Sequence, residues 1–292
     1  MALTLLGAAE AVWQAVVPVL PGFTVELLPE IDSTNSELMR RARAGQVEPV
    51  LLLAHKQTAG RGRLGRQWVS DVNASAPASD SNASSASAAQ LPTTSLTFSL
   101  GLPMAPYDWS GLSLAAGLSV ARSLHPDIRL KWPNDLWLHG RKLGGILIET
   151  ATIGVSSGSR YVVLGVGLNL QAPAATGLST PPAGLVEVWP EVTAAQALTR
   201  LAAPLVETLQ VFVQQGFSPF QERFQALDAL AGLSVVLSDG TTGVAHGVDA
   251  SGALRVQTEA GWQRVSSAEV SVRPAGMALP AVLPQVPPAV RD

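Results

Sequence analysis

A short segment rich in arginine and glycine, residues 57–68, carries the strongest chemical signal in this sequence. Arg61, Arg63 and Arg66, three of the chain's 19 basic residues, alternate there with glycine. Glycine lets backbone N–H groups turn toward an anion, and arginine forks bind phosphate or carboxylate oxygens in pairs. The spacing matches neither the GxxxxGK[ST] phosphate loop nor the GxGxxG dinucleotide turn. The segment therefore predicts an anion-binding loop, with a solvated basic loop or an RGG-like RNA-binding stretch as alternatives.

Two lysines and one carboxylate occur in a second segment, where strand, turn and strand are predicted to follow one another. Lys131 and Asp135 flank a Trp-Pro-Asn sequence, and Lys142 comes just before the next predicted strand. A hairpin of this kind brings both lysines toward one end, near the carboxylate. Because Mg²⁺ takes one or two carboxylates plus substrate phosphates, Asp135 is a candidate metal ligand. The alternative is that it is only a turn residue.

Two further segments have residue types that suit a ligand. Gly165 and Gly167 alternate in a predicted strand that leads to Asn169. Glycine weakens a strand interior, which suggests that a ligand or another backbone lies against it, or else that there is a bulge or tight helix packing. Residues 32–35 (Asp-Ser-Thr-Asn) stand at a strand-to-helix junction. Their hydroxyl and amide groups could bind a small polar ligand or act only as helix caps.

Hydrophobic periodicity and turn residues predict the elements that must position these side chains. We expect strands at 23–31, 50–54, 95–102, 128–131, 135–138, 143–153 and 160–170, and helices at 3–17, from the caps at 32–35 to 45, and at 109–124, 193–215 and 219–230. The fold class is therefore α+β, a mixed sheet flanked by helices over residues 1–230. Short β runs predict a small antiparallel module at 231–275, followed by a flexible tail at 276–292. The Ser/Ala/Asn-rich residues 71–92 predict a disordered insert, and 171–190 a long functional loop.

Composition excludes several classes of function. The chain has no cysteine, which rules out disulfides, thiolate metal sites and a cysteine nucleophile, and its four histidines leave little for a metal site. Its net charge of −3 lacks the basic excess expected of a protein that acts on nucleic acid or anionic membranes. No apolar run reaches the ~20 residues that span a bilayer, and no secretory signal is recognisable. We expect a cytoplasmic protein with local phosphate binding and no membrane partner.

Five motifs in this order resemble the signature of biotin protein ligases, the biotin–[acetyl-CoA-carboxylase] ligases. They are Ser33-Thr34-Asn35, Gln57 with residues 60–68, Lys131–Asp135, Arg141–Glu149 and Gly165–Asn169. The resemblance covers about residues 29–169 and extends more weakly into the C-terminal module. It implies a catalytic domain of the class II synthetase and biotin/lipoate ligase kind, followed by an SH3-like barrel. Members of this family convert biotin and MgATP to biotinyl-5′-AMP and pyrophosphate, then transfer biotin to one lysine of a biotin carboxyl carrier protein.

The resemblance also implies roles for individual residues. The residues implied for the biotin pocket are Ser33, Thr34, Asn35, Gln57, Gly62, Gly165 and Gly167. Those implied for catalysis are Arg61, Arg63 and Lys142, with Lys142 stabilising charge where the carboxylate attacks the α-phosphate. Those implied for ATP or adenylate binding are Arg66, Trp68, Lys131, Asn134 and Asn169, with Asp135 for Mg²⁺. The cofactors are thus ATP and Mg²⁺, biotin is the substrate, and no protein nucleophile is required.

Other expectations concern the surroundings of this site. Trp189 in the 171–190 loop is a candidate for stacking on adenine, and the C-terminal module could help the carrier domain dock. Because only residues 1–22 precede the first predicted strand, we expect a monofunctional ligase without the N-terminal DNA-binding domain of regulatory members, and no DNA partner. The insert at 71–92 is expected to be a tolerated surface loop. A homodimer is left open. The alternatives are a lipoate- or octanoate-type ligase or acyltransferase of the same fold, and an RNA-binding protein.

Overall fold

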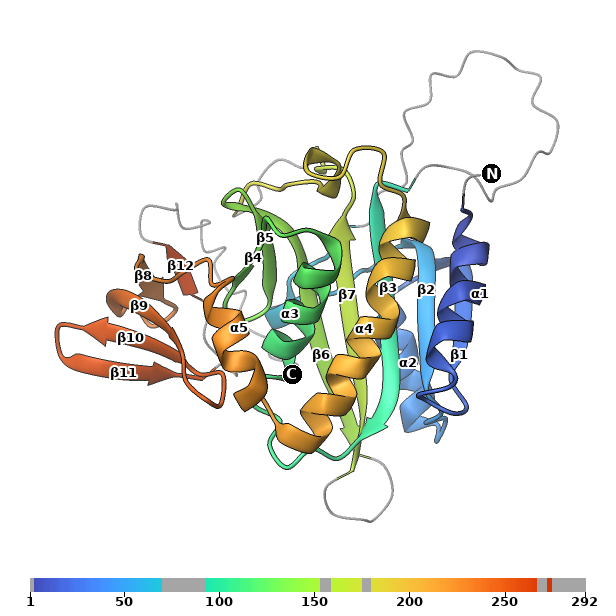
Figure 1. The fold of residues 1–292 in the computed structure, drawn as a ribbon, viewed down its shortest axis with the longest axis horizontal. Helices are drawn as coiled ribbons and strands as arrows, with labels where there is room; N and C mark the ends of the chain where they lie inside the picture. Colours follow the sequence, from blue (N-terminus) through green and yellow to red (C-terminus); the bar gives the residue numbers. More distant parts are fainter. Residues whose placement is uncertain (1–2, 70–92, 153–158, 175–179, 267–271, 275–292) are drawn as a thin grey trace, which may run out of the picture.

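A seven-stranded sheet forms the centre of the computed structural model, which describes residues 3–69, 93–152, 159–174, 180–266 and 272–274 (Figure 1). The strand order is β1-β2-β3-β7-β6-β5-β4. The strands are β1 (Thr24–Ile31), β2 (Val50–Gln57), β3 (Ser95–Met104), β4 (Ile128–Lys131), β5 (Asp135–Leu138), β6 (Arg141–Thr152) and β7 (Arg160–Asn169). β1 and β2 are parallel and all other neighbours are antiparallel, so the predicted mixed sheet is confirmed.

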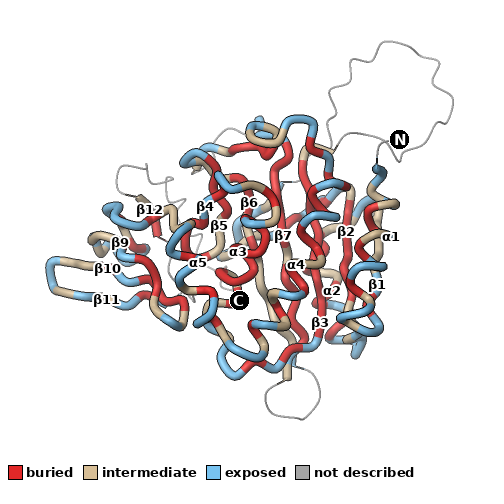
Figure 2. The backbone as a smooth tube through the Cα atoms, viewed as in Figure 1, coloured by how far each residue is buried: buried red, intermediate tan, exposed pale blue. Residues whose placement is uncertain are grey.

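Residue alternation along the central strands separates two faces of this sheet. One face packs against α1 (Leu5–Val16), α3 (Leu112–Leu124) and α4 (Ala194–Gln215). Figure 2 shows that the central strands covered by these helices are mostly buried. Phe98 and Leu164 on this face are fully buried. The opposite face carries α2 (Thr34–Arg43), where Leu38 forms a second small cluster with Tyr161 and Val163. One face of β3 and β7 therefore contributes to the main hydrophobic core, and the other face packs against α2.

Several elements differ from the expectation in their bounds; β2, for example, continues to Gln57 rather than ending at 54. The helix expected at 219–230 is a 3-10 turn (Ser218–Phe220) followed by a short α5 (Gln221–Gln225). It stops early because residues 227–229 run alongside β4, where Leu130 N donates to Leu227 O (2.8 Å) and Ala229 N to Leu130 O (2.9 Å). The third helix begins at Leu112 rather than at 109, and β6 begins at 141, so that Lys142 lies inside the strand. The insert expected at 71–92 and the tail at 276–292 lie outside the described residues.

The small antiparallel module expected at the C-terminus is present at one end of the molecule (Figure 1). It consists of β8 (Ser234–Leu237), β9 (Thr242–Val248), β10 (Leu254–Thr258), β11 (Gly261–Val265) and β12 (Val272–Pro274), in the order β11-β10-β9-β8-β12. Its buried Val235 and Leu254 belong to the same hydrophobic cluster as the main body. Trp132, which is fully buried, donates its Nε1 hydrogen to Gly252 O (3.0 Å). The module is therefore bonded directly to the segment that follows β4.

Candidate active site

A cavity of about 230 Å³ opens beside α2. All sixteen residues that the sequence predicted to contact biotin, ATP or Mg²⁺ line it: Ser33, Thr34, Asn35, Gln57, Arg61, Gly62, Arg63, Arg66, Trp68, Lys131, Asn134, Asp135, Lys142, Gly165, Gly167 and Asn169. They come from five separate stretches of chain, which the mixed sheet and α2 bring together. The structure brings all of them to one cavity, while the role of each toward a ligand remains a prediction.

Buried polar groups form a continuous network on one wall of the cavity. Gln57 Oε1 accepts a hydrogen bond from Thr34 N (2.8 Å) and lies 3.2 Å from Thr34 Oγ1. Thr34 Oγ1 is 2.7 Å from Ser99 Oγ, which donates to Asn35 Oδ1 (2.6 Å). All four side chains belong to residues that are at most 8% exposed. Because buried hydroxyl and amide groups need partners, this network fixes the orientations that a polar ligand would meet.

The alternating glycines of β7 make room for side chains of the protein itself. A Cβ at Gly165 would lie 2.1 Å from Asn35 Oδ1, and a Cβ at Gly167 would lie 2.5 Å from Trp68 Cε2. Both distances are far below any real Cβ contact. The sequence suggested a ligand or a backbone against this strand, with tight helix packing as the alternative. The structure favours that alternative at Gly165, where the first turn of α2 rests on the strand, and it places an indole ring at Gly167.

The arginine–glycine loop forms a narrow turn over the cavity. Gly62 N donates to Arg66 O (2.7 Å), which closes the tip, and Trp68 N donates to Gly60 O (2.9 Å) near its base. A Cβ at Gly60 would lie 2.4 Å from Trp68 O, so the two sides of the turn can approach only where a side chain is missing. Leu64 at the tip has φ 55°, a left-handed conformation that is unusual for a non-glycine residue. Gly60 therefore lets the two sides of the loop approach each other, while the anion contact expected of the loop glycines remains a prediction.

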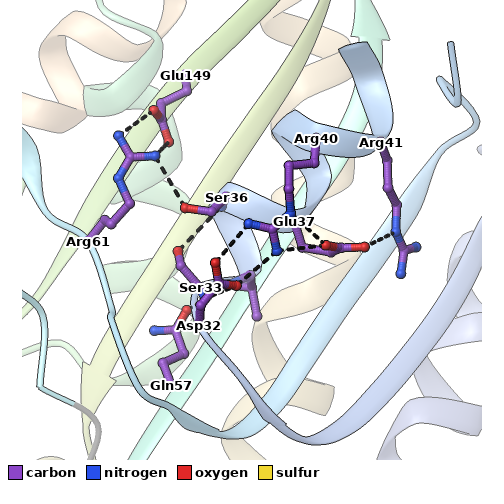
Figure 3. A network of polar contacts seen from close by, with 10 residues as sticks. Asp32, Ser33, Ser36, Glu37, Arg40, Arg41, Gln57, Arg61 and Glu149 are labelled. Atoms are coloured by element: carbon purple, nitrogen blue, oxygen red, sulfur yellow. Dashed lines mark hydrogen bonds and ion pairs between the residues drawn. The ribbon is translucent and has the colours of Figure 1, made fainter. Parts of the chain in front are cut away.

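Charged pairs brace the N-terminal end of α2 (Figure 3). Arg40 Nη1 lies 2.7 Å from Asp32 Oδ2, and Arg40 also pairs with Glu37 at 2.8 Å. The hydrogen bond from Arg40 lowers the pKa of Asp32 to about 2. On the other side of the helix start, Arg61 Nη2 from the loop lies 2.9 Å from Glu149 Oε1 on β6. The residues of α2 that reach the cavity are thus held from both sides.

Cationic side chains gather along another part of the cavity wall. Lys142 Nζ lies 2.7 Å from Asp135 Oδ1, and Lys131 Nζ lies 3.8 Å from Asp135 Oδ2. Arg63 Nη1 approaches Asn134 Oδ1 at 3.4 Å, which brings the loop to the turn after β4. Burial lowers the pKa of the Arg63 guanidinium, and the Asp135 charge opposes this effect. Arginine nevertheless stays protonated, so a bound anion would offset the cost of desolvating it.

An irregularity in the β5–β6 pairing places Lys142 in this group. Residues alternate between faces along a strand, so Lys142 and Gly145 would ordinarily point to opposite sides. The register shifts between Leu136 and Trp137 on β5, however, and Leu143 is fully buried in the main core. The bulge turns Lys142 to the face on which Asp135 accepts its hydrogen bond.

Asn169 at the end of β7 ties a segment of the long loop to the sheet. Its Nδ2 donates to Ala183 O (3.1 Å) and lies 3.4 Å from Lys142 O. The backbone of Lys142 pairs with the same segment, donating to Pro181 O (2.8 Å) and accepting from Ala183 N (2.8 Å). Asn169 therefore positions the neighbouring Pro182, which lines the cavity.

The sequence suggested one site residue, Trp189, that does not line the cavity, and it gave no prediction for two polar residues of β3. Trp189 packs against the main core with Arg200 stacked over its ring at 5.0 Å, and it is not among the residues that line the cavity. Thr97 and Ser99 on β3 were not predicted, although Thr97 lines the cavity and Ser99 belongs to its polar network. The alternating hydroxyl residues at 95, 97 and 99 were the signal that could have indicated a polar strand face.

The side chains that line the cavity suit a metal ion bound mainly by the phosphates of a nucleotide, not one coordinated mainly by protein ligands. Within the described ranges, no three His, Cys, Asp or Glu side chains gather closely enough to hold a metal ion. Asp135 is the one acidic residue among those that line the cavity. Mg²⁺ bound to a nucleotide needs only one or two protein carboxylates, because phosphates and waters supply the other ligands. Asp135 therefore fits the predicted contact to MgATP.

Comparisons with known proteins define the class. Residues 27–169 match the Biotin/lipoate A/B protein ligase family, and residues 235–273 match the biotin protein ligase C terminal domain. The bifunctional ligase/repressor BirA of Escherichia coli is 31% identical over 272 residues, which cover 88% of this chain and 76% of that protein. A biotin–[acetyl-CoA-carboxylase] ligase of Paracoccus denitrificans is 32% identical over 254 residues, 84% of this chain and 98% of that one. The structure of a biotin protein ligase from Aquifex aeolicus in complex with biotin and ATP matches with a TM-score of 0.66 at 26% identity, covering 86% of this chain and 99% of the other.

The chain belongs to the biotin protein ligase family, as its two matched regions and its similarity to these full-length ligases establish. The family, the fold class and the kind of enzyme predicted from the five motifs are thereby confirmed. Among the described residues, no helix combines the length and apolar character needed to cross a bilayer.

Proposed function

We propose that this chain joins biotin to AMP with MgATP, releases pyrophosphate, and then transfers biotin to a lysine of a biotin carboxyl carrier domain. One observation carries the proposal: a single cavity contains both a buried polar wall and a group of cations from separate motifs. The first suits an uncharged polar head, and the second suits a carboxylate and phosphates. Biotin and ATP together supply those groups.

The polar wall favours biotin over a linear acyl acid. The ureido ring of biotin has one carbonyl and two N–H groups, each of which needs a partner once it is buried. Thr34, Asn35 and Gln57 bring hydroxyl and amide groups to one wall. A lipoyl or octanoyl chain would place hydrocarbon against these groups and use none of them. The arrangement therefore supports the biotin substrate over the linear alternatives.

The cations serve the first half-reaction. A carboxylate oxygen of biotin attacks the α-phosphorus of ATP, a new P–O bond forms, and the bond to pyrophosphate breaks. Anions must approach each other in this step, and fixed positive groups lower that cost without solvent reorganisation. Lys142 and Arg63 line the cavity for this purpose, and Lys131 stands beside them across Asp135. Mg²⁺ on the nucleotide would neutralise further phosphate charge, with Asp135 as its contact to the protein.

The second half-reaction requires the activated acid to wait for the acceptor. The uncharged lysine amine of the carrier attacks the carbonyl carbon of the mixed anhydride, a C–N bond forms, the nitrogen releases a proton to solvent, and AMP leaves with the electrons of the broken C–O bond. Water would hydrolyse the same anhydride, so the cavity must retain and shelter it. The arginine–glycine loop with Arg63 at its turn lies over the cavity and suits this role.

The setting in which this reaction takes place follows from its substrates. The reaction needs ATP and a folded carrier domain, which supports action in the cytoplasm. The net charge of −3 supports a partner that is a protein rather than DNA.

Exchange of radiolabelled pyrophosphate into ATP tests the function, with biotin, lipoate and octanoate offered in parallel. Biotin-dependent exchange that disappears in Lys142→Met is the expected result. Exchange with only lipoate or octanoate would overturn the substrate assignment. RNA binding with a steep salt dependence, no ATP requirement and no exchange with any acid would replace the enzyme by a nucleic-acid-binding protein.

A further inference from the structure

Glu149 is a charged residue next to the cavity for which the two half-reactions give no role. It lies on β6, on the face that carries α2, and its side chain is 21% exposed. Its carboxylate contacts two elements at once. Arg61 Nη2 lies 2.9 Å from Oε1, and Oε2 accepts from Arg61 Nη1 (3.1 Å), as Figure 3 shows. Oε2 also accepts from Asn35 Nδ2 (3.0 Å). One carboxylate thus joins the arginine–glycine loop to the first turn of α2.

The loop, which contains a 3-10 turn (Arg63–Gly65) and an isolated bridge between Arg61 and Gln67, lies outside the main sheet, so its attachments decide how firmly it stays over the cavity. Thr58 N donates to Ile31 O (2.9 Å) at the base of the loop. The Arg61–Glu149 pair lies three residues further toward the tip. Bidentate pairs between arginine and a carboxylate are among the stronger hydrogen-bonded contacts, and they fix geometry as well as distance. This pair is therefore suited to hold the loop down over the cavity.

The Arg61–Glu149 pair also bears on the role of Arg61 in the reaction. The resemblance to the family implied a catalytic role for this side chain, but its guanidinium is already bound by a carboxylate and points toward Ser36 Oγ on α2 (3.4 Å). Paired one to one, Arg61 and Glu149 leave little net positive charge to attract phosphate, whereas two lysines share the single carboxylate of Asp135. The cations grouped around Asp135, by contrast, lie where the phosphate chemistry would take place.

We propose that Glu149 is a positioning residue that latches the arginine–glycine loop onto α2. The latch sets how firmly biotin and its adenylate are retained, and it takes no part in forming the P–O bond. Release of the ligand requires the loop to lift, which breaks the bonds from Arg61. The same carboxylate orients Asn35, so its loss also loosens the polar wall. The ligands named here rest on the proposed function, whereas the latch is a property of the free protein.

Glu149→Gln is the variant that tests the latch, and Glu26→Gln is its matched control. Gln keeps the shape of the side chain but removes the charge and turns one acceptor oxygen into a donor that faces Arg61 and Asn35. Glu26 on β1 makes the same kind of bidentate pair with Arg41 of α2 (2.8 and 2.9 Å), and neither residue lines the cavity. In Glu149→Gln the KM for biotin and the rate of adenylate release are expected to rise about tenfold or more, which corresponds to about 1.4 kcal/mol. Adenylate formation in a single turnover at saturating substrates is expected to change less than threefold.

Limited digestion of the free protein with trypsin gives a readout that needs no substrate. Trypsin cleaves after arginine, and the loop contains Arg61, Arg63 and Arg66. Cleavage at these sites, identified by fragment mass, is expected to accelerate in Glu149→Gln and to stay at the wild-type rate in Glu26→Gln. Equal cleavage in all three proteins overturns the latch. If the wild type forms no biotinyl adenylate, the proposed function fails, and the digestion still decides the latch.

Arg61→Gln removes the pair from the loop side and leaves the bond between Glu149 and Asn35 in place. Because this substitution also removes the trypsin site at residue 61, the comparison uses cleavage after Arg63 and Arg66. Faster cleavage at these two sites is expected even if Glu149→Gln unfolds, which separates the latch from a general loss of folding. The double variant is expected to release adenylate no faster than the more severe single variant, since both changes break one contact. Additive effects overturn the proposal, and so does a fall in saturated adenylate formation as large as the rise in KM.

Discussion

Gly165→Ala is the smallest change that tests how α2 is seated on the sheet. The added Cβ would lie 2.1 Å from Asn35 Oδ1 and 3.0 Å from Asn35 Cγ. Asn35 must retreat by about 1 Å to reach an ordinary contact, and overpacking of this kind costs about 1–3 kcal/mol. The retreat also stretches the bonds to Ser99 (2.6 Å) and Glu149 (3.0 Å).

The expected loss of stability in Gly165→Ala is about 2 kcal/mol, which lowers Tm by roughly 4–8 °C in a chain of this size. The KM for biotin is expected to rise about tenfold or more, because the polar wall loses its orientation. Differential scanning calorimetry and pyrophosphate exchange measure the two effects. Gly7→Ala is the matched control, since its Cβ would meet Thr4 Oγ1 at an ordinary 3.4 Å in α1. A wild-type Tm and KM in Gly165→Ala would refute the reasoning.

Three further predictions concern the chemistry, the pH dependence and the contact with the C-terminal module. Lys142→Met is expected to slow single-turnover adenylate formation about 10²–10³-fold while calorimetry shows biotin affinity within threefold of the wild type. Burial raises the pKa of Asp228 to about 6 from 3.8, so the folded state binds this proton more tightly and stability falls as pH rises from about 4 to 6. Asp228→Asn is therefore expected to stabilise the protein at pH 7.5 but not at pH 4, as urea unfolding at both values would reveal. Trp132→Phe removes the bond to Gly252 O and is expected to cost about 1–3 kcal/mol in the same unfolding assay, whereas a stability within experimental error of the wild type would contradict it.

The elements were predictable wherever the pattern of one segment decides its structure. Ser33 caps α2 through Ser36 N (3.3 Å) as the sequence indicated, and β7 has nearly the expected bounds. The prediction of a helix at 219–230 was wrong for a non-local reason, since the α-helix ends at Gln225. Its second half has helical spacing, but the unpaired edge of β4 offers Leu130 as a partner for residues 227–229. Backbone N–H and C=O groups find hydrogen-bond partners at a strand edge as well as they do in a helix. The sequence of residues 219–230 alone does not show that such an edge lies beside them.

The candidate site was predictable as a set of residue types but not as a set of contacts. Arginines among glycines and lysines around a turn indicate anion binding. The order of the motifs, which resembles that of a known family, predicted that these residues meet at one site. The partners of those residues depend on registers between distant strands. Glu149 meets Arg61 across the sheet, and Ser99 meets Asn35 from a strand that the motifs did not include. The β5–β6 bulge that turns Lys142 toward Asp135 is equally invisible before the pairing is known.

The distribution of charge around the cavity explains how an acidic protein can bind two anions. Five cationic side chains and one carboxylate line the cavity, although the whole chain has a net charge of −3. Arg61 is neutralised by Glu149, so the remaining positive charge concentrates around Asp135 and Arg63. A local excess in a partly buried site acts at short range, where salt screens it little, whereas the net charge governs long-range association. Affinity for the adenylate should therefore depend much less on ionic strength than the rate at which free ATP is captured.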